Sequence, residues 1–144
     1  MERAWFDRAF AELTTEQLYR IIELREHVFI LEQHCAYPEC DGADRVARHL
    51  WRESDDRIDA YLRIVPAGVK FEEVAIGRVV VAEHARGTGL GKELMRRGLA
   101  AAGDVPIRIG AQAHLEKFYT ELGFARASDN YDDDGIPHLE MLRP

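Results

Sequence analysis

The sequence has no long apolar run: nowhere in its 144 residues does a hydrophobic stretch approach the roughly 20 residues that cross a bilayer. Its first ten residues, MERAWFDRAF, also lack the apolar core of a signal peptide. We therefore expect a cytoplasmic protein with no membrane partner. Repeats, low-complexity tracts and long linkers are missing too. With 47% hydrophobic and 31% charged residues, the composition predicts one folded domain over residues 1–144.

Basic charge is in deficit. The chain has 19 Lys and Arg residues against 26 Asp and Glu residues, for a net charge of −7. A general nucleic-acid-binding protein presents a basic face, so we expect no nucleic-acid partner.

Cysteine is scarce, with only Cys35 and Cys40, in the stretch HCAYPEC. A zinc site would need more ligands at closer spacing, and His34 is the only neighbour that could supply one. The pattern therefore favours two free thiols in a loop and no metal ion. A zinc site, or a thiol that carries an acyl group, are the alternatives that the pattern disfavours.

Apolar spacing predicts a mixed α/β or α+β fold. A long helix should begin at the capping pair Thr14 and Gln17 and bury a stripe from Leu18 to Leu31. Further helices are expected at 88–102, ended by Gly103, and at 113–122, ended by Gly123. Strands are expected at 3–6, 46–53, 57–66, 75–83, 105–110, 124–128 and 138–142, with a loop at 34–45 and an acidic turn at 129–137.

The stretch VVVAEHARGTGLGKELM places a glycine-rich turn between a strand and a helix. It is not a nucleotide P-loop, because Arg86 replaces the first glycine and Glu93 replaces the magnesium-binding hydroxyl. It is not a dinucleotide fingerprint, because Lys92 replaces the third glycine. Two interpretations remain: a plain tight turn, or backbone N–H groups at a helix start that bind a diphosphate.

Two motifs in order favour the second interpretation. RGTGLG fits the pattern R/Q-x-x-G-x-G/A and resembles the acyl-CoA diphosphate loop of the GNAT superfamily of N-acetyltransferases. Downstream, QAHLEKFYTELGF resembles the second motif of that superfamily. The stretches VFILEQHCAYPECDGAD, IGRVVV, GAQAHL and DGIPHLEM are similar to the ElaA group of small bacterial acyltransferases. The resemblance implies a mixed, mostly antiparallel sheet of about six to seven strands with about four flanking helices.

The resemblance also implies roles for individual residues. The backbone of Val79 and Val81 would pair with the pantetheine arm of acetyl-CoA, and Gln112 stands where an Asn is usual. Tyr119 would protonate the departing thiolate as general acid. The diphosphate would be surrounded by Arg86, Gly87, Thr88, Gly89, Leu90, Gly91 and Lys92.

The expected reaction is direct transfer of an acetyl group to a primary amine in a ternary complex, without a metal. An alkyl amine is almost fully protonated at pH 7, so a base must take its proton. Glu32 is the candidate base, and the acceptor-site candidates are Glu32, Gln33, His114 and His138. The alternative is a non-catalytic acyl-CoA-binding module or sensor. The acceptor, a small molecule or peptide, is not identified by the sequence, and a homodimer is one oligomeric state left open.

Overall fold

The computed structural model describes residues 2–35 and 38–144. Its strands are β1 (Arg3–Ala9), β2 (Arg48–Ser54), β3 (Arg57–Val65), β4 (Val74–Val81), β5 (Ile107–Gln112), β6 (Ala125–Arg126), β7 (Tyr131–Asp133) and β8 (Ile136–Arg143). The α-helices are α1 (Thr15–Arg25), α2 (Leu90–Ala102) and α3 (Glu116–Thr120). The π-helical segment η2 (Glu26–Glu32) continues α1, and the short 3₁₀ turns are η1 (Phe10–Glu12), η3 (Ala43–Arg45), η4 (Glu83–Ala85) and η5 (Ala113–Leu115).

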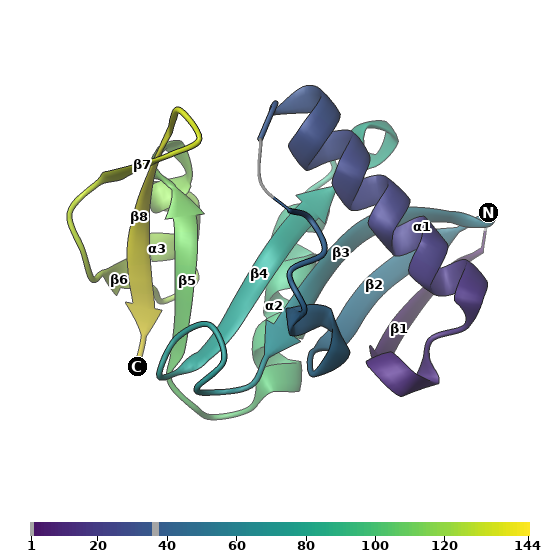
Figure 1. Ribbon diagram of the computed structural model, residues 1–144, viewed down its shortest axis with the longest axis horizontal. Helices are drawn as coiled ribbons and strands as arrows, with labels where there is room; N and C mark the ends of the chain where they lie inside the picture. Colours follow the sequence, from purple (N-terminus) through teal and green to yellow (C-terminus); the bar gives the residue numbers. More distant parts are fainter. Residues whose placement is uncertain (1, 36–37) are drawn as a thin grey trace.

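The strands form one mixed sheet in the order β1-β2-β3-β4-β5-β8-β6, with β7 also paired to β8. The pairing of β4 with β5 is parallel, and the other pairings are antiparallel. Figure 1 shows β4 and β5 close together where they start and diverging toward the top of the view. The expectation of a mixed, mostly antiparallel sheet with flanking helices is confirmed.

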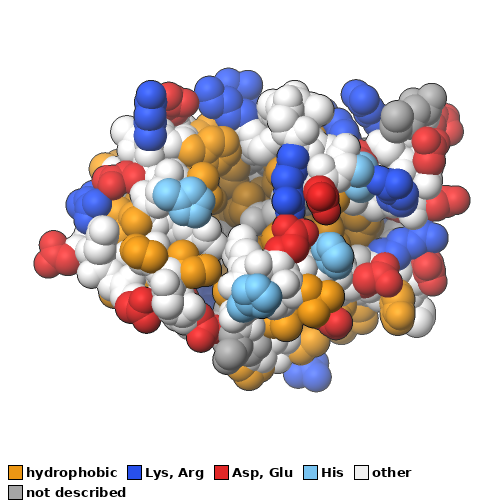
Figure 2. Space-filling view, turned by 90° about the horizontal axis from the view of Figure 1, so that it is seen from above, with side chains coloured by type: hydrophobic (Ala, Val, Ile, Leu, Met, Phe, Trp, Pro, Cys, Tyr) orange, Lys and Arg blue, Asp and Glu red, His pale blue; other side chains and the backbone are white. Residues whose placement is uncertain are grey.

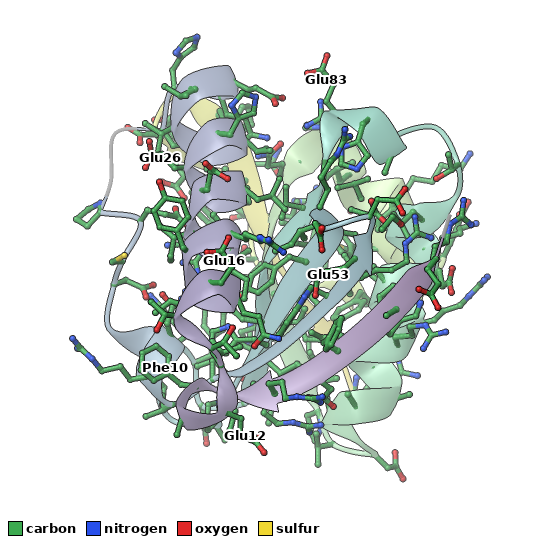
Figure 3. The ribbon with its side chains drawn as sticks, turned by 90° about the vertical axis from the view of Figure 1, so that its right-hand side faces the viewer. Phe10, Glu12, Glu16, Glu26, Glu53 and Glu83 are labelled. Carbon is green, nitrogen blue, oxygen red and sulfur yellow. The ribbon has the colours of Figure 1, made fainter. Side chains whose placement is uncertain are left out.

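Helices cover both faces of the sheet. Seen from the side, α1 lies over one face and α2 over the other (Figure 3). Ile21 and Val28 pack with Trp51 and Tyr61 on the first face. On the second face Leu94 and Met95 of α2 join a larger core cluster with strand residues such as Leu62, Ile76 and Leu139. Strand β3 is therefore buried on both sides.

Helix α1 begins as its capping pair predicts. The Thr14 hydroxyl oxygen accepts the N–H of Gln17 at 3.0 Å, and the Gln17 side-chain oxygen accepts the N–H of Thr14 at 2.9 Å. On the outer face, Arg20 bridges Glu16 of α1 and Glu53 of β2 at 3.0 and 3.4 Å; Figure 3 labels both carboxylates.

The apolar stripe of this helix does not continue to Leu31. In the π-helical segment the N–H of Gln33 donates to the Val28 carbonyl at 3.0 Å, five residues back rather than four. The wider turn rotates the later side chains of the segment away from the core, so Leu31 is 59% exposed. The prediction that Leu31 faces the core was wrong, because it assumed α-helical periodicity throughout.

The remaining differences are local. The predicted hairpin of β2 and β3 is confirmed, and its turn residues Asp55 and Asp56 both have positive φ, as two-residue hairpin turns require. The prediction of an acidic turn over 129–137 was wrong in part, because the stretch contains β7. The three residues of this strand are exposed and pair with β8, and Tyr131 alone gives no alternating apolar pattern. Among the described residues no helix is long and apolar enough to cross a membrane.

Candidate active site

A cleft opens where β4 and β5 part. The two strands pair only at Val74 with Ile107 and Ala75 with Arg108, although β4 continues to Val81 and β5 to Gln112. The resulting cavity, about 840 Å³, is lined by residues of β4 and β5, the end of η2, α3 and β7–β8. In Figure 2 hydrophobic side chains line a hollow on this face, with basic and acidic side chains beside it. Beyond their short paired stretch, the facing edges of the two strands are open to an extended ligand.

Strand β4 carries a bulge at this cleft. The register with β3 runs from Tyr61 opposite Val80 to Arg63 opposite Gly77, so Leu62 faces two residues, Arg78 and Val79. A bulge leaves its extra peptide group out of the strand ladder. Because Gly77, Arg78 and Val79 all line the cavity, the unladdered peptide groups lie at its wall.

The glycine loop forms an open helix start, as the sequence indicates. Gly87 and Gly89 have φ angles of 77° and 79°, a left-handed conformation that glycine adopts without strain. Gly89 caps α2, so the N–H groups of Leu90, Gly91 and Lys92 have no acceptor within the helix, whose first bond runs from the Glu93 N–H to the Gly89 carbonyl. A Cβ at Gly91 would lie 3.8 Å from both the Phe118 ring and the Val81 side chain. The loop therefore offers unpaired donors close to the cleft.

The basic side chains of this loop already have partners. Arg86 donates from Nε to the Val81 carbonyl and from Nη2 to Glu32, both at 3.0 Å. Lys92 pairs with Glu121 at 3.2 Å. A diphosphate would therefore meet backbone N–H groups first, and it would have to compete with Glu32 for the Arg86 guanidinium.

Gln112 spans the cleft at the end of β5. Its Nε2 donates to Oε1 of Gln33, at the end of η2, at 3.0 Å. The longer side chain that replaces the usual Asn thus ties two of the predicted site residues together across the opening.

Tyr119 lies on α3 and lines the same cavity. Its side chain is 7% exposed, and its ring meets Phe118 and Phe124 edge-on at 5.1 and 5.9 Å. Burial raises the pKa of Tyr119 to about 12. Among the described residues its hydroxyl has no hydrogen-bond partner. It is therefore a protonated, unpaired donor at the cleft.

The candidate acceptor-site residues surround different parts of the opening. Glu32, Gln33, His114 and His138 all line the cavity. Glu32 is held by Arg86 and lies 3.6 Å from His27. The Nδ1 of His138 lies 2.8 Å from the Ile136 carbonyl, and its ring stacks on Tyr131. His114 is exposed.

Within the described residues neither cysteine forms a disulfide bond; Cys35 is buried and Cys40 exposed. Within residues 2–35 and 38–144, the side chains that approach closely enough to share a metal ion are those of His27, Glu32 and Glu83, all exposed. This group does not include either thiol.

Some cavity residues had no predicted role. Asp41, Lys70 and Arg78 line the cleft, and the carboxylate of Asp41 pairs with both cations. The signal in the sequence was weak: an arginine inside the apolar run AIGRVVV, and three acids in the loop PECDGAD.

Comparisons with known proteins agree with this geometry. The family model of the acetyltransferase (GNAT) domain matches residues 45–143. Protein ElaA of Escherichia coli is 41% identical over 145 residues, covering 96% of this chain and 95% of that protein. The crystal structure of Escherichia coli ElaA superposes with a TM-score of 0.93 at 39% identity, covering 99% of this chain and 100% of that chain.

A crystal structure described as an acyl-CoA N-acyltransferase from Pseudomonas aeruginosa superposes with a TM-score of 0.95 at 41% identity. It covers 99% of this chain and 100% of that one. The matches span the cleft, the glycine loop and the helix that bears Tyr119, and the chain belongs to the GNAT acetyltransferase family.

Proposed function

We propose that the protein transfers an acetyl group from acetyl-CoA to a primary amine by direct attack in a ternary complex. The observation that carries the proposal is the cleft between β4 and β5, whose facing backbone edges pair over only two residues. Buried N–H and C=O groups need partners, and the extended, amide-bearing arm of an acyl-CoA offers them in the manner of a strand. The related Pseudomonas aeruginosa structure is described as an acyl-CoA N-acyltransferase.

The glycine loop would bind the diphosphate of this substrate. Unpaired N–H groups and the helix dipole at the start of α2 favour an anion there. Positive φ at Gly87 and Gly89 turns the backbone without a side chain in the approach. Val79 and Val81 would present main-chain groups to the pantetheine arm, as the pattern of the family implies.

Tyr119 would protonate the departing thiolate. When the amine nitrogen attacks the thioester carbonyl, the C–N bond forms, the C–S bond breaks and the sulfur takes the electron pair. The Tyr119 hydroxyl is protonated at neutral pH and can donate a hydrogen bond to that sulfur, or a proton as the C–S bond breaks. The amine must also lose its proton, and Glu32, His114 and His138 at the cleft are the groups proposed to accept it.

A non-catalytic acyl-CoA-binding module is the second candidate. The observation that favours it is the ion pair between Glu32 and Arg86. Because of this pair, none of the proposed bases is an unpaired carboxylate. The two candidates differ in turnover, not in binding.

The test begins with calorimetric titration of acetyl-CoA and CoA against the wild-type protein. Gly89→Asp should abolish binding, because it places a carboxylate against the diphosphate. Gly89→Asn is the matched control: it has the same size and tolerates positive φ, but it adds no charge. Equal binding by Gly89→Asp and wild type would refute the loop assignment. CoA release with a panel of amines then separates an enzyme from a binding module.

A further inference from the structure

Arg78 has a left-handed backbone inside a strand. Its φ is 51°. The other described non-glycine residues with positive φ are His34, Asp55, Asp56 and Asp134, and all four lie outside strands. Short Asp and Asn side chains ease this conformation by local hydrogen bonds, which an arginine cannot copy. The conformation at the bulge therefore depends on contacts that Arg78 makes elsewhere.

Two carboxylates of a distant segment hold the Arg78 side chain. Its Nε donates to Oε1 of Glu39 at 3.0 Å, and its Nη2 lies 3.5 Å from Oδ2 of Asp41. Glu39 and Asp41 lie 39 and 37 residues away in the sequence. The bulge is thus tied to the segment that comes after η2.

Two buried arginines also bind these carboxylates. Arg25 of α1 is 0% exposed and donates from Nε to Glu39 at 2.6 Å. Arg63 of β3 is 2% exposed and donates to both oxygens of Asp41 at 2.9 and 2.7 Å. Asp44 joins the two arginines, accepting from each through Oδ1 at 2.8 and 2.9 Å. We refer to Arg25, Glu39, Asp41, Asp44, Arg63 and Arg78 as the buried ion cluster.

Asp41 and Asp44 of the cluster stay charged. Burial by itself would raise the pKa of Asp41, but hydrogen bonds from Arg63 and Lys70 outweigh it and hold that pKa far below its ordinary range. Arg25 and Arg63 do the same for the pKa of Asp44. His49 is adjacent, with Nε2 2.9 Å from the Asp44 carbonyl, and burial lowers its pKa, so it adds no charge at neutral pH.

We propose that Glu39 and Asp41 are positioning residues, which act through Arg78 to fix the β4 bulge at the wall of the cleft where the thioester must lie. The inference rests on the proposed acyl-CoA site. Neither carboxylate is required to touch the reacting atoms. Arg25, Asp44 and Arg63 join α1, the loop and β3. The additional pairs to Arg78 extend that cluster to the segment of β4 whose register with β3 is broken.

A fixed bulge matters because a misplacement of about 1 Å at a reacting group can cost roughly 100-fold in rate. CoA and acetyl-CoA share the diphosphate and the pantetheine arm, and only acetyl-CoA has a thioester carbonyl to be positioned. Loss of the anchor should therefore slow transfer much more than it weakens the binding of CoA.

Arg78→Gly is the main variant, because glycine adopts positive φ without strain while removing the anchor. We expect acetyl transfer per bound complex to fall about 10- to 100-fold, with CoA affinity within about threefold of wild type. Glu39→Gln is the second variant. Its oxygen can still accept from both guanidinium groups, because Oε2 of Glu39 has no hydrogen-bond partner, so only charge is lost and the fall should be smaller.

Glu73→Gln is the control. Arg108 donates to both oxygens of Glu73 at 2.9 Å, so this is also an Arg–Glu ion pair, but it lies at the paired end of β4 and β5. It should leave transfer unchanged. The measurements are single-turnover transfer to any accepted amine, calorimetry with CoA and with acetyl-CoA, and thermal melting of each variant.

Wild-type transfer rates in both Arg78→Gly and Glu39→Gln would overturn the inference. So would a parallel loss of CoA and acetyl-CoA binding with an unchanged rate per bound complex, which would indicate a general effect on the cleft. If wild type itself fails to bind CoA, the proposed function fails. If wild type transfers acetyl groups and the two variants match it, only the role of Glu39 and Asp41 fails.

Discussion

Replacing Tyr119 by Phe removes only the hydroxyl oxygen, so the variant tests the chemical role of the hydroxyl group. The ring packs edge-on against Phe118 and Phe124, and phenylalanine keeps both contacts. Because the hydroxyl has no partner among the described residues, its loss leaves no buried group unsatisfied. The stability of the variant should therefore lie within about 1 kcal/mol of wild type, below the usual cost of breaking a buried hydrogen bond.

The effect on rate should be much larger than the effect on stability. General acid catalysis contributes roughly 10²- to 10⁴-fold, and a thiolate, with a pKa near 8.5 for cysteine as reference, already leaves tolerably well. We expect acetyl transfer to fall by about one to three orders of magnitude, with little change in acetyl-CoA affinity. With a pKa of about 12, Tyr119 stays protonated through the assay range, so its own titration should not appear in the pH–rate profile below about pH 11.

Alkaline pH gives an independent check. Because burial raises the pKa of Tyr119 above its unfolded value, the folded state holds this proton more tightly. The corresponding stability is fully present below pH 10 and is lost as the pH rises toward 12. Tyr119→Phe should lose this part of the dependence of stability on alkaline pH.

Steady-state kinetics, a CoA titration and melting curves at several pH values measure the transfer rate, the cofactor affinity and the alkaline stability of the variant. Unchanged turnover in the variant would reduce Tyr119 to a packing aromatic, and a loss of binding alone would make it a substrate contact.

Further substitutions and acid pH test the fold. Arg25→Ala removes a fully buried partner from the carboxylates of Glu39 and Asp44, which keep only Arg78 and Arg63, and should destabilise the protein by about 3–5 kcal/mol in urea unfolding; a loss under 1 kcal/mol would contradict this. Thr14→Ala removes the cap of α1 and should cost about 0.5–2 kcal/mol in the same assay, with Thr15→Ala, one position into the helix, as control. Since arginines outweigh burial and lower the pKa of Asp41 and Asp44, their stabilisation is present above pH 4 and should be lost as pH falls below it, a trend that circular dichroism would detect.

The sequence was informative where one segment determines its own structure. The Thr14 cap, the hairpin turn at Asp55 and Asp56, and the glycine start of α2 each depend on residues within a few positions of one another. The glycine loop and Tyr119 could be singled out because each belongs to a compact motif. Their meeting at one cleft could be expected only through the resemblance to the GNAT superfamily.

The features that were missed depend on partners far apart in the chain. Arg25 meets Asp44 across 19 residues, Arg63 meets Asp41 across 22, and Arg78 meets Glu39 across 39. No local pattern states that a charged side chain will be buried with a particular partner. The rotation at Leu31 was missed for another reason: hydrogen bonding shifts from α to π within a continuous helix, which the apolar spacing does not mark.

The cleft contains two facing strand edges that are not hydrogen-bonded to each other beyond their short paired stretch, and several contacts surround them. Two facing strand edges without hydrogen bonds are expected to close up or to pair with something else. At one end α2 starts with Gly91 close to Phe118 and Val81, and at the opening Gln112 and Gln33 join β5 to the end of η2. Along β4, the bulge at Arg78 interrupts the ladder with β3, and Glu39 and Asp41 bind the Arg78 side chain. Beyond Ala75 and Arg108 the facing edges of β4 and β5 stay unpaired with each other, so their backbone groups are available to an extended substrate in the gap.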